Sequence, residues 1–250
     1  GYVQDKIHVN DKWDVTPALR YSHYNSFSGT RQAKRDSSGK IVKDGSGNVV
    51  YVDSKHRGDV STLTPVINTE YMFSDDFSAY AGWTKIYRPI KGRDYATDAY
   101  GGGALKDEKG DVWTIGLRKG IGPNTEVTVH YDWTKMSNAI TQDSVDDPSI
   151  PGHRLTLYVN AKEDKQSFNI TVDHKFNDHW NLGLAYTHFK DTYRAKDGVP
   201  LRPAVLRPSN HFTMNLSYEN NKFYSGLLVN WYTGMDTTAY TDNQFLVLDW

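Results

Sequence analysis

Two arginines and two tyrosines lie close together in the sequence and have the chemistry to bind an anionic aromatic ligand. They are Arg88, Arg93, Tyr95 and Tyr100. A guanidinium forms charge-assisted hydrogen bonds with anionic oxygens and stacks on aromatic rings, and a phenol offers both a ring and a hydroxyl. We therefore take these four residues as the candidate ligand-binding set. The alternative is that Tyr95 and Tyr100 only anchor a loop.

His130 and Asp132 have the same parity along one predicted strand, among other polar positions. They are therefore expected to face the polar side of the strand and to join a hydrogen-bond network in the interior of a barrel. The nine histidines show no helical pair four residues apart and no His-Glu-x-x-His motif. We expect no metal site and no cofactor. No Gly-x-Ser-x-Gly elbow is present, so we expect no enzyme.

Three glycines in a row at 101–103 raise the question of a phosphate-binding loop. They do not lie between a strand and a helix, and no Gly-Lys-Ser/Thr follows. We therefore interpret them as residues that give an outward loop conformational freedom. The acidic stretches 106–111 and 141–147 lack the spacing of a twelve-residue calcium loop that closes on a glutamate. Both are expected to be solvated loops.

A near repeat occurs at 36–42 and 44–50, with the sequences DSSGKIV and DGSGNVV. Each copy has a turn-forming Asp-x-Ser-Gly or Asp-Gly-Ser-Gly run followed by a β-branched pair. The repeat predicts a small projecting hairpin, and such a hairpin would be suited to act as a flap over a ligand.

Composition narrows the partners. The chain has 250 residues with 29 basic and 30 acidic side chains, so its net charge of −1 does not favour nucleic acid. It contains no cysteine, which excludes disulfides and thiolate metal sites. No run approaches the roughly 18 to 20 apolar residues of a membrane-spanning helix. A membrane β-barrel stays open, because alternating strands are hydrophilic on average.

Alternation of apolar and polar residues predicts an all-β chain folded as an antiparallel meander. Within 126–134, the odd positions are valine, tyrosine and tryptophan, and the even positions are polar. The apolar parity changes inside the strand 154–176, which predicts a β-bulge near 160–167. The predicted strands are 2–10, 15–29, 60–73, 78–88, 112–121, 126–140, 154–176, 182–194, 210–219, 223–235 and 243–250.

Short turns alternate with long polar segments, so the sheet is expected to have two unlike ends. The short turns are 10–14, 74–78, 122–126, 177–181 and 219–222. The long segments are 30–58, 91–110, 142–153, 196–208 and 236–241. This asymmetry, the long strands, and 17 Tyr and 7 Trp often near strand ends favour an outer-membrane barrel with aromatic girdles. A soluble sandwich or propeller would show the same alternation and is the alternative.

Several stretches resemble the barrel of a TonB-dependent outer-membrane receptor. The segment 2–24, YVQDKIHVNDKWDVTPALRYSHY, resembles the family's Tyr-x-Gln-Asp opening, its Asp-Lys turn and its Thr-Pro-x-Leu-Arg-Tyr strand. The segment 61–89 resembles the next hairpin, which ends in the family at Phe-Arg-Ala-Pro and here at Tyr-Arg-Pro-Ile. The segment 104–121 resembles the Asn-Pro-Asn-Leu-Lys-Pro-Glu-Lys stretch, with Gly103 and Ala104 at its first positions. Segments 177–194 and 206–218 continue the likeness.

The resemblance implies that residues 1–250 are about strands 10 to 20 of a 22-stranded transmembrane barrel. The plug domain and the last strands would be missing from the chain. It further implies a receptor in the outer membrane that takes up a metal chelate, for which we expect a ferric siderophore. The TonB complex would act through the plug, and outer-membrane lipid would surround the barrel. Haem receptors of the family often have a histidine between the two motifs, and 90–103 has none. The alternatives are a soluble or surface β-rich binding module and a passive porin.

Overall fold

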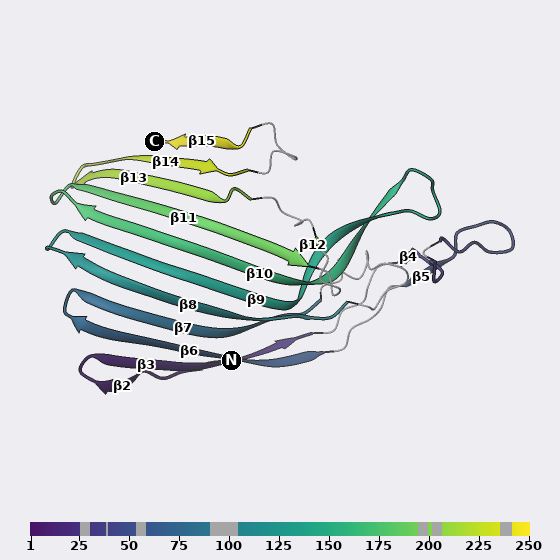
Figure 1. The fold of residues 1–250 in the computed structure, drawn as a ribbon, viewed down its shortest axis with the longest axis horizontal. Coiled ribbons are helices and arrows are strands. Elements are labelled where there is room, and N and C mark those ends of the chain that lie inside the picture. Colours follow the sequence, from purple (N-terminus) through teal and green to yellow (C-terminus); the bar gives the residue numbers. More distant parts are fainter. Residues whose placement is uncertain are drawn as a thin grey trace.

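The computed structural model describes residues 1–25, 31–38, 40–53, 59–90, 105–194, 200–201, 207–235 and 242–250. These residues are all-β and form one 13-stranded sheet and one two-stranded sheet (Figure 1). The described part of the chain contains no helix that is long and apolar enough to cross a membrane. The strands are β1 (Tyr2–Gln4), β2 (Ile7–Asn10), β3 (Trp13–Tyr24), β4 (Arg31–Ala33), β5 (Tyr51–Asp53), β6 (Val60–Ser74), β7 (Phe77–Arg88), β8 (Glu108–Ile121), β9 (Thr125–Asp146), β10 (Arg154–Lys175), β11 (Trp180–Arg194), β12 (Pro200–Leu201), β13 (Asn210–Asn220), β14 (Phe223–Thr233) and β15 (Gln244–Asp249).

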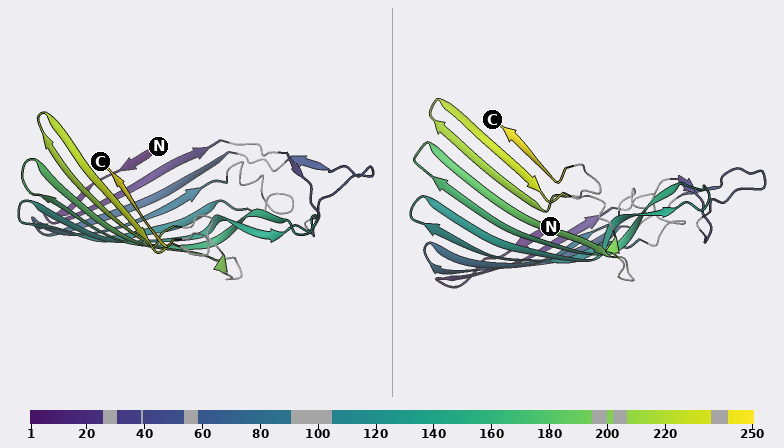
Figure 2. Two further views of the ribbon diagram at one scale, coloured as in Figure 1. Left: turned by 90° about the horizontal axis from the view of Figure 1, so that it is seen from above. Right: turned by 45° about the horizontal axis from the view of Figure 1, so that its top comes forward.

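The large sheet is an antiparallel meander, as predicted. Its strand order is β1-β3-β6-β7-β8-β9-β10-β11-β13-β14-β15, so β1 and β15 are its edges and the sheet is open. Figure 2 shows that it is curved, as part of a barrel wall would be. The predicted strand 2–10 is divided into β1 and β2, which both pair with β3. The interruption lies opposite Pro17, which has no N–H to donate to a neighbouring strand.

The two ends of the sheet differ as the sequence predicts (Figure 1). Short turns join the strands at what we call the turn end, at 11–12, 75–76, 122–124, 176–179 and 221–222. At the opposite end, here the loop end, β3, β7 and β11 finish and the long segments begin. Strands β9 and β10 have 22 residues each and extend beyond their neighbours. The prediction of a solvated loop at 141–147 is therefore wrong for 141–146, which are paired with β10.

A register shift between Ala161 and Glu163 occurs where β10 pairs with β9. It lies inside the range predicted for a β-bulge from the change of apolar parity. Ala139 and Ala161 face each other just beyond it and are only 2% and 1% exposed. The prediction of a bulge is thus confirmed, and the small side chains let the strands pack closely there.

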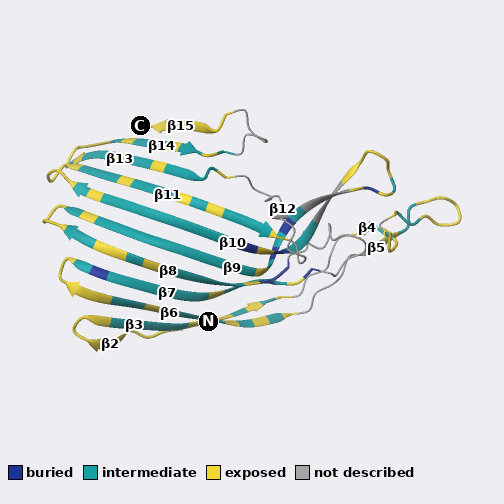
Figure 3. Ribbon diagram, viewed as in Figure 1, coloured by how far each residue is buried: buried dark blue, intermediate teal, exposed yellow. Residues whose placement is uncertain are grey.

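The polar residues lie on the concave face of the sheet. A hollow of about 840 Å³ is lined by residues of distant strands, among them Asp14 of β3, Arg118 of β8 and Asn215 of β13. Side chains this far apart in the sheet can surround one hollow only on its concave side. The apolar face is left open, with Ile115 60% exposed. Figure 3 shows few buried positions, most of them near the loop end. A soluble sandwich would instead cover its apolar face with a second sheet.

Two bands of aromatic side chains cross the apolar face. Toward the loop end, the Trp113 and Trp133 rings lie 5.4 Å apart. At the turn end, the Trp180 and Tyr218 rings lie 5.0 Å apart. Gln166 is the register partner of Trp133. Phe176, whose backbone N–H donates to the carbonyl oxygen of Trp180, lies ten positions further along the chain. At about 3.3 Å per residue and a strand tilt of about 40°, the bands are separated by about 25 Å, the height of the apolar band of an outer-membrane barrel.

Candidate ligand-binding site at the loop end

Arg88 is the last residue of β7, and its guanidinium is held by a carboxylate. Its Nε donates a hydrogen bond to Oε2 of Glu108, the register partner at the start of β8. The other oxygen of Glu108 accepts the backbone N–H of Ile140 at 2.6 Å. Glu108 is 8% exposed, whereas the Arg88 side chain is 38% exposed. Arg88 is thus oriented by a buried partner while part of its side chain reaches solvent. Arg93, Tyr95 and Tyr100 lie outside the described residues.

The residues on either side of the segment 91–104 are fixed to the sheet. Ile90 and Leu105 are buried against each other, and Ile140 and Tyr158 pack on them. The backbone N–H of Ile90 donates to Asp107 Oδ1 at 3.0 Å. The prediction of a solvated loop at 106–111 is therefore wrong. Most of this segment is in β8. Its carboxylates at Asp107 and Glu108 accept backbone N–H groups of Ile90 and Ile140, and these hydrogen bonds hold the strand ends together.

Asn160 completes the attachment of this region. Its Oδ1 accepts the backbone N–H of Lys106 at 2.6 Å, and its Nδ2 donates to the carbonyl oxygen of Lys106 at 2.9 Å. The same Nδ2 lies 3.0 Å from the carbonyl oxygen of Asn138. One side chain of β10 thus ties the entry of β8 to β9. The residues that flank the segment 91–104 are thus bonded to the sheet on both sides.

The segment 31–53 forms the small projecting hairpin that its near repeat predicts. Strands β4 and β5 pair at its base, and Arg35 and Lys43 bridge to Ile41 and Val49 further out. Asp36 Oδ1 accepts the N–H of Ser38 at 2.8 Å and of Lys40 at 3.0 Å. Asp44 Oδ1 accepts the N–H groups two and four residues later, both at 2.9 Å. The repeated sequence thus makes the same turn twice. The role of a flap over a ligand stays a prediction.

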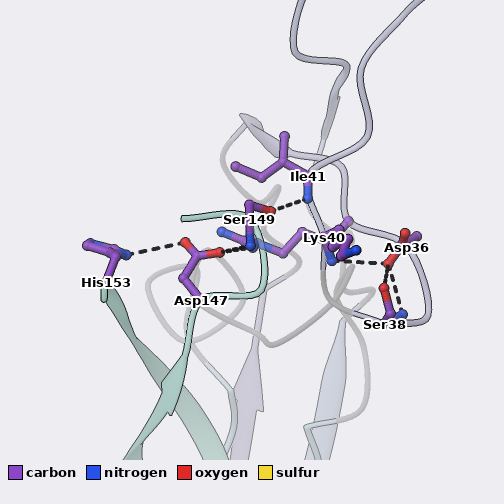
Figure 4. A network of polar contacts seen from close by, with 8 residues as sticks. Asp36, Ser38, Lys40, Ile41, Asp147, Ser149 and His153 are labelled. Carbon is purple, nitrogen blue, oxygen red and sulfur yellow. Dashed lines mark hydrogen bonds and ion pairs between the residues drawn. The ribbon is translucent and has the colours of Figure 1, made fainter. Parts of the chain in front are cut away.

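The hairpin touches the tip of the β9–β10 projection through Asp147 (Figure 4). This carboxylate accepts the backbone N–H of Ser149 at 2.8 Å and Nη1 of Arg35 at 3.2 Å, and Nδ1 of His153 also lies at 3.2 Å. The hydroxyl of Ser149 accepts the N–H of Ile41 at 2.6 Å. Asp147 is 5% exposed, so the predicted solvated loop is wrong here too. We call these five residues the loop clasp.

The loop clasp has a charged centre. The backbone N–H of Ser149 and the guanidinium of Arg35 hold the pKa of the Asp147 carboxyl below its ordinary value. The carboxylate therefore stays ionised well into the acid range. Nothing in the sequence signals this contact, because Arg35 and Asp147 are far apart along the chain.

Asp132 lies in a set of hydrogen bonds on the concave face, and His130 lies beside it on the same strand. His130 Nε2 is 3.4 Å from Asp132 Oδ2. Thr114 of β8 donates to Asp132 Oδ1 at 2.6 Å, and Asn169 Nδ2 of β10 lies 3.4 Å from Oδ2. Thr187 of β11 donates to Asn169 Oδ1 at 2.8 Å. The set links four neighbouring strands. Sequence reasoning missed Thr114, Asn169 and Thr187, although their polar parity offered a signal. The role predicted for His130 and Asp132 stays a prediction.

Comparison with known proteins identifies the family of this chain. Residues 1–249 match the family model of the TonB dependent receptor-like β-barrel. The chain belongs to the TonB-dependent receptor β-barrel family. Members of this family are outer-membrane receptors and transporters and not a class of enzymes. Among the described residues of this receptor barrel, no group of three or more His, Asp or Glu could hold a metal ion.

Solved structures support the same fold at low identity. The ferric-catecholate import receptor Fiu from E. coli K12 is 17% identical, with a TM-score of 0.65, and the alignment covers 99% of this chain and 36% of Fiu. The ferric yersiniabactin uptake receptor FyuA from Yersinia pestis is 14% identical, with a TM-score of 0.66 and coverage of 99% and 36%. The copper transporter OprC is 12% identical, with a TM-score of 0.65 and coverage of 93% and 35%. The receptor barrel thus spans about a third of these proteins. No curated protein matches it.

Proposed function

We propose that this receptor barrel forms part of an outer-membrane transporter that takes up a metal chelate, specifically a ferric siderophore. The proposal is supported by similar structures that are named as importers of ferric catecholate and ferric yersiniabactin. The observation that carries it is the loop end itself. There the concave polar wall meets Arg88 and the fixed ends of the segment 91–104.

The chelate is proposed to bind at Arg88, Arg93, Tyr95 and Tyr100. A ferric siderophore is commonly an anionic chelate with aromatic rings, so guanidinium and phenol groups match it in charge and shape. Glu108 orients Arg88 and compensates part of its charge. The remaining residues of the set would then supply most of the attraction for an anion.

Residues 1–250 are proposed to be about strands 10 to 20 of the barrel domain. The plug and the last strands would come from elsewhere in the protein, and the TonB complex would act through the plug. His130 and Asp132 are proposed to hold neighbouring strands of the interior wall together. Four strands linked by side-chain hydrogen bonds suit a wall against which a plug has to move.

The proposal is tested with the full-length protein in a strain that lacks its own siderophore receptors. We expect uptake of radioactive ferric siderophore that stops when TonB is deleted. The variant R93Q/Y95A/Y100A should bind the chelate at least about ten-fold more weakly, because several charge-assisted and stacking contacts are lost. The variant R154Q, at a position with an exposed side chain on β10, is the control.

Two results would contradict the proposal. Uptake that persists without TonB and is matched by ion conductance in planar bilayers would identify a passive porin. A full-length protein that is soluble without detergent would identify a soluble β-rich binding module. Binding of copper complexes or haem in place of ferric siderophores would keep the transporter and change its cargo.

A further inference from the structure

The wall of the receptor barrel has an opening between β6 and β7 at the loop end. Both strands lie wholly within the described part of the chain, and the last residue pair between them is Val66 with Thr84. Beyond that pair, residues 60–65 of β6 are paired with β3, and residues 85–88 of β7 are paired with β8. Each strand thus continues toward the loop end with its other neighbour. We call this break in the pairing the lateral opening.

Pro65 explains why the pairing stops at this level. Its carbonyl oxygen faces β7, because the hydroxyl of Thr84 lies 3.5 Å from it. The next step of the ladder would need an N–H from the same residue, and proline has none. The Thr84 hydroxyl also donates to the carbonyl oxygen of Lys85 at 3.1 Å. One hydroxyl thus lies beside the carbonyl groups on both sides of the break.

The lateral opening is bounded and passes through the wall. At its loop end, the rings of Tyr24 on β3 and Tyr87 on β7 lie 5.9 Å apart. An inner hollow of about 480 Å³ and an outer groove of about 950 Å³ meet along it. The residues that line both are Thr62 and Thr64 of β6 and Lys85, Ile86 and Tyr87 of β7. Because the two hollows share these residues, the opening connects the two faces of the sheet.

The inner hollow suits a polar head group with negative charge. Arg20 lines it and has the same parity on β3 as Asp14, so the hollow lies on the concave face. The side chain of Arg20 is exposed. Tyr2 and Tyr24 line the same hollow and bring phenol groups beside the guanidinium. This combination matches anionic oxygens and aromatic rings.

The outer side of the lateral opening leads to the apolar face. Ile67 is the register partner of Trp83, and Leu63 lies four residues further along β6 on the same face. Leu63 is 58% exposed and Ile67 is 44% exposed. Tryptophan rings mark the level at which a barrel meets the membrane interface. An apolar chain that leaves the opening would therefore reach the hydrocarbon of the membrane along these two side chains.

We propose that the lateral opening holds the acyl chain of an amphiphilic chelate whose head group binds in the inner hollow. The inference rests on the proposed function and adds that the ligand carries an apolar tail. An acyl chain gains affinity with each methylene group that leaves water, whereas an anionic head group gains affinity from charge-assisted hydrogen bonds. The two sides of the opening offer these two environments, so a ligand with both parts fits it.

The test compares a ferric tris-catecholate chelate with the same chelate carrying a saturated acyl chain of about twelve carbons. It uses the full-length variant L63C/K85C in detergent, because both positions are exposed on the outer side of the lateral opening. Residues 1–250 contain no cysteine, and any cysteine elsewhere in the protein is replaced by serine. A short reagent that joins the two thiols should close the opening. The same variant with each thiol capped separately is the matched control.

Binding of both chelates is measured by quenching of protein fluorescence at one detergent concentration. We expect the acyl chain to improve affinity about ten-fold more in the capped protein than in the joined protein, because about two methylene groups leave water in the opening. The chelate without the chain should bind both proteins equally, since the inner hollow is unchanged.

An equal gain from the acyl chain in the joined and capped proteins would overturn the inference. So would joining that weakens both chelates alike, because the lateral opening would then serve the head group. A protein that binds the plain chelate and gains nothing from the acyl chain would fail only this inference, whereas a protein that binds neither chelate would fail the proposed function.

Discussion

The turn end and the loop end of the same strands are held by different kinds of contact. At the turn end, an asparagine accepts an N–H from two residues later in three turns, at 2.9 Å each. These are Asn10 with Lys12, Asn177 with His179, and Asn220 with Lys222. At the loop end, Arg35 and Ile41 bond to Asp147 and Ser149, more than a hundred residues away. These turns are specified by neighbours in the sequence, whereas the contact between the hairpin and the β9–β10 projection exists only in the folded protein.

This difference indicates which parts of the receptor barrel can change in sequence while the fold of the barrel is kept. Local turns specify the hairpins, and the alternation of strand residues specifies the two faces. The wall can therefore keep its shape at 17% identity, with a TM-score of 0.65 to Fiu. The loop end depends on particular long-range pairs. The long segments there can change in sequence while the hairpins and their turns stay as they are.

The largest effect is expected from E108A at the loop end. The change leaves the buried N–H of Ile140 without its acceptor and Arg88 without its carboxylate. We expect the free energy of unfolding to fall by about 3 kcal/mol, because a buried donor and a partly buried cation both lose their partner. Urea unfolding of the full-length protein in detergent measures it.

E108Q is the matched variant, since it keeps an acceptor for Ile140 and removes the charge. It should lose less than E108A. D76A at the turn end removes the exposed partner of Lys119 and should change the unfolding midpoint little. Equal losses for E108A and D76A would remove the contrast between the two ends.

The second effect uses two glycines of the same strand, β8. A Cβ at Gly110, near the loop end, would lie 2.5 Å from the backbone oxygen of Lys135. At Gly120, near the turn end, the nearest atom would be Asp76 Cβ at 3.4 Å. G110A should therefore cost about 2 kcal/mol through overpacking against backbone, while G120A should cost less than about 0.5 kcal/mol. The midpoints of urea unfolding of the two variants measure this difference. If G110A is as stable as G120A, the backbone at the loop end shifts easily to make room for the added methyl group.

These contrasts explain what the sequence could predict. The eleven predicted strands follow from alternation and turn residues, although the structure divides the first of them into β1 and β2. The meander, the hairpin at 31–53 and the bulge follow from the same signals, which act over a few positions. The prediction that the acidic stretches at 106–111 and 141–147 are solvated loops is wrong, because their charge indicated exposure to solvent. Glu108 is bonded to Ile140, which lies beside it because of the pairing of β8 with β9. Asp147 is contacted by Arg35 of the hairpin, which lies beside it only in the tertiary fold. No local pattern predicts either long-range contact.

A smaller effect is expected from N177A at the turn end. Asn177 Oδ1 accepts the N–H groups of His179 and Trp180 at 2.9 and 3.0 Å. Without these two hydrogen bonds the free energy of unfolding should fall by about 1 kcal/mol, as it does when a capping side chain is removed from a helix. N177D keeps the acceptor oxygen and should restore stability. If N177A costs as much as E108A, the turn end is not the locally independent unit that its short contacts indicate.

The smallest effect concerns the loop clasp and appears only in acid. The pKa of Asp147 is lowered in the folded protein, chiefly by the Ser149 N–H and also by Arg35. Its stabilising contribution is therefore complete above the ordinary aspartate pKa of about 4 and is lost as the pH falls through the lowered pKa. Amide exchange of Ile41 and Ser149, corrected for the intrinsic effect of pH, should show equal protection at pH 7 and pH 5 and faster exchange near pH 2.

D147N should remove this acid-dependent step and show the faster exchange at every pH, because the neutral amide holds Arg35 weakly. D44N is the control. Asp44 also has a lowered pKa, caused by the Asn48 N–H, but it bonds only within its own turn. Its replacement should leave Ile41 and Ser149 protected as before. If D44N speeds the amide exchange of Ile41 as much as D147N does, the hairpin opens from its own tip. The contact with the β9–β10 projection would then not stabilise the hairpin.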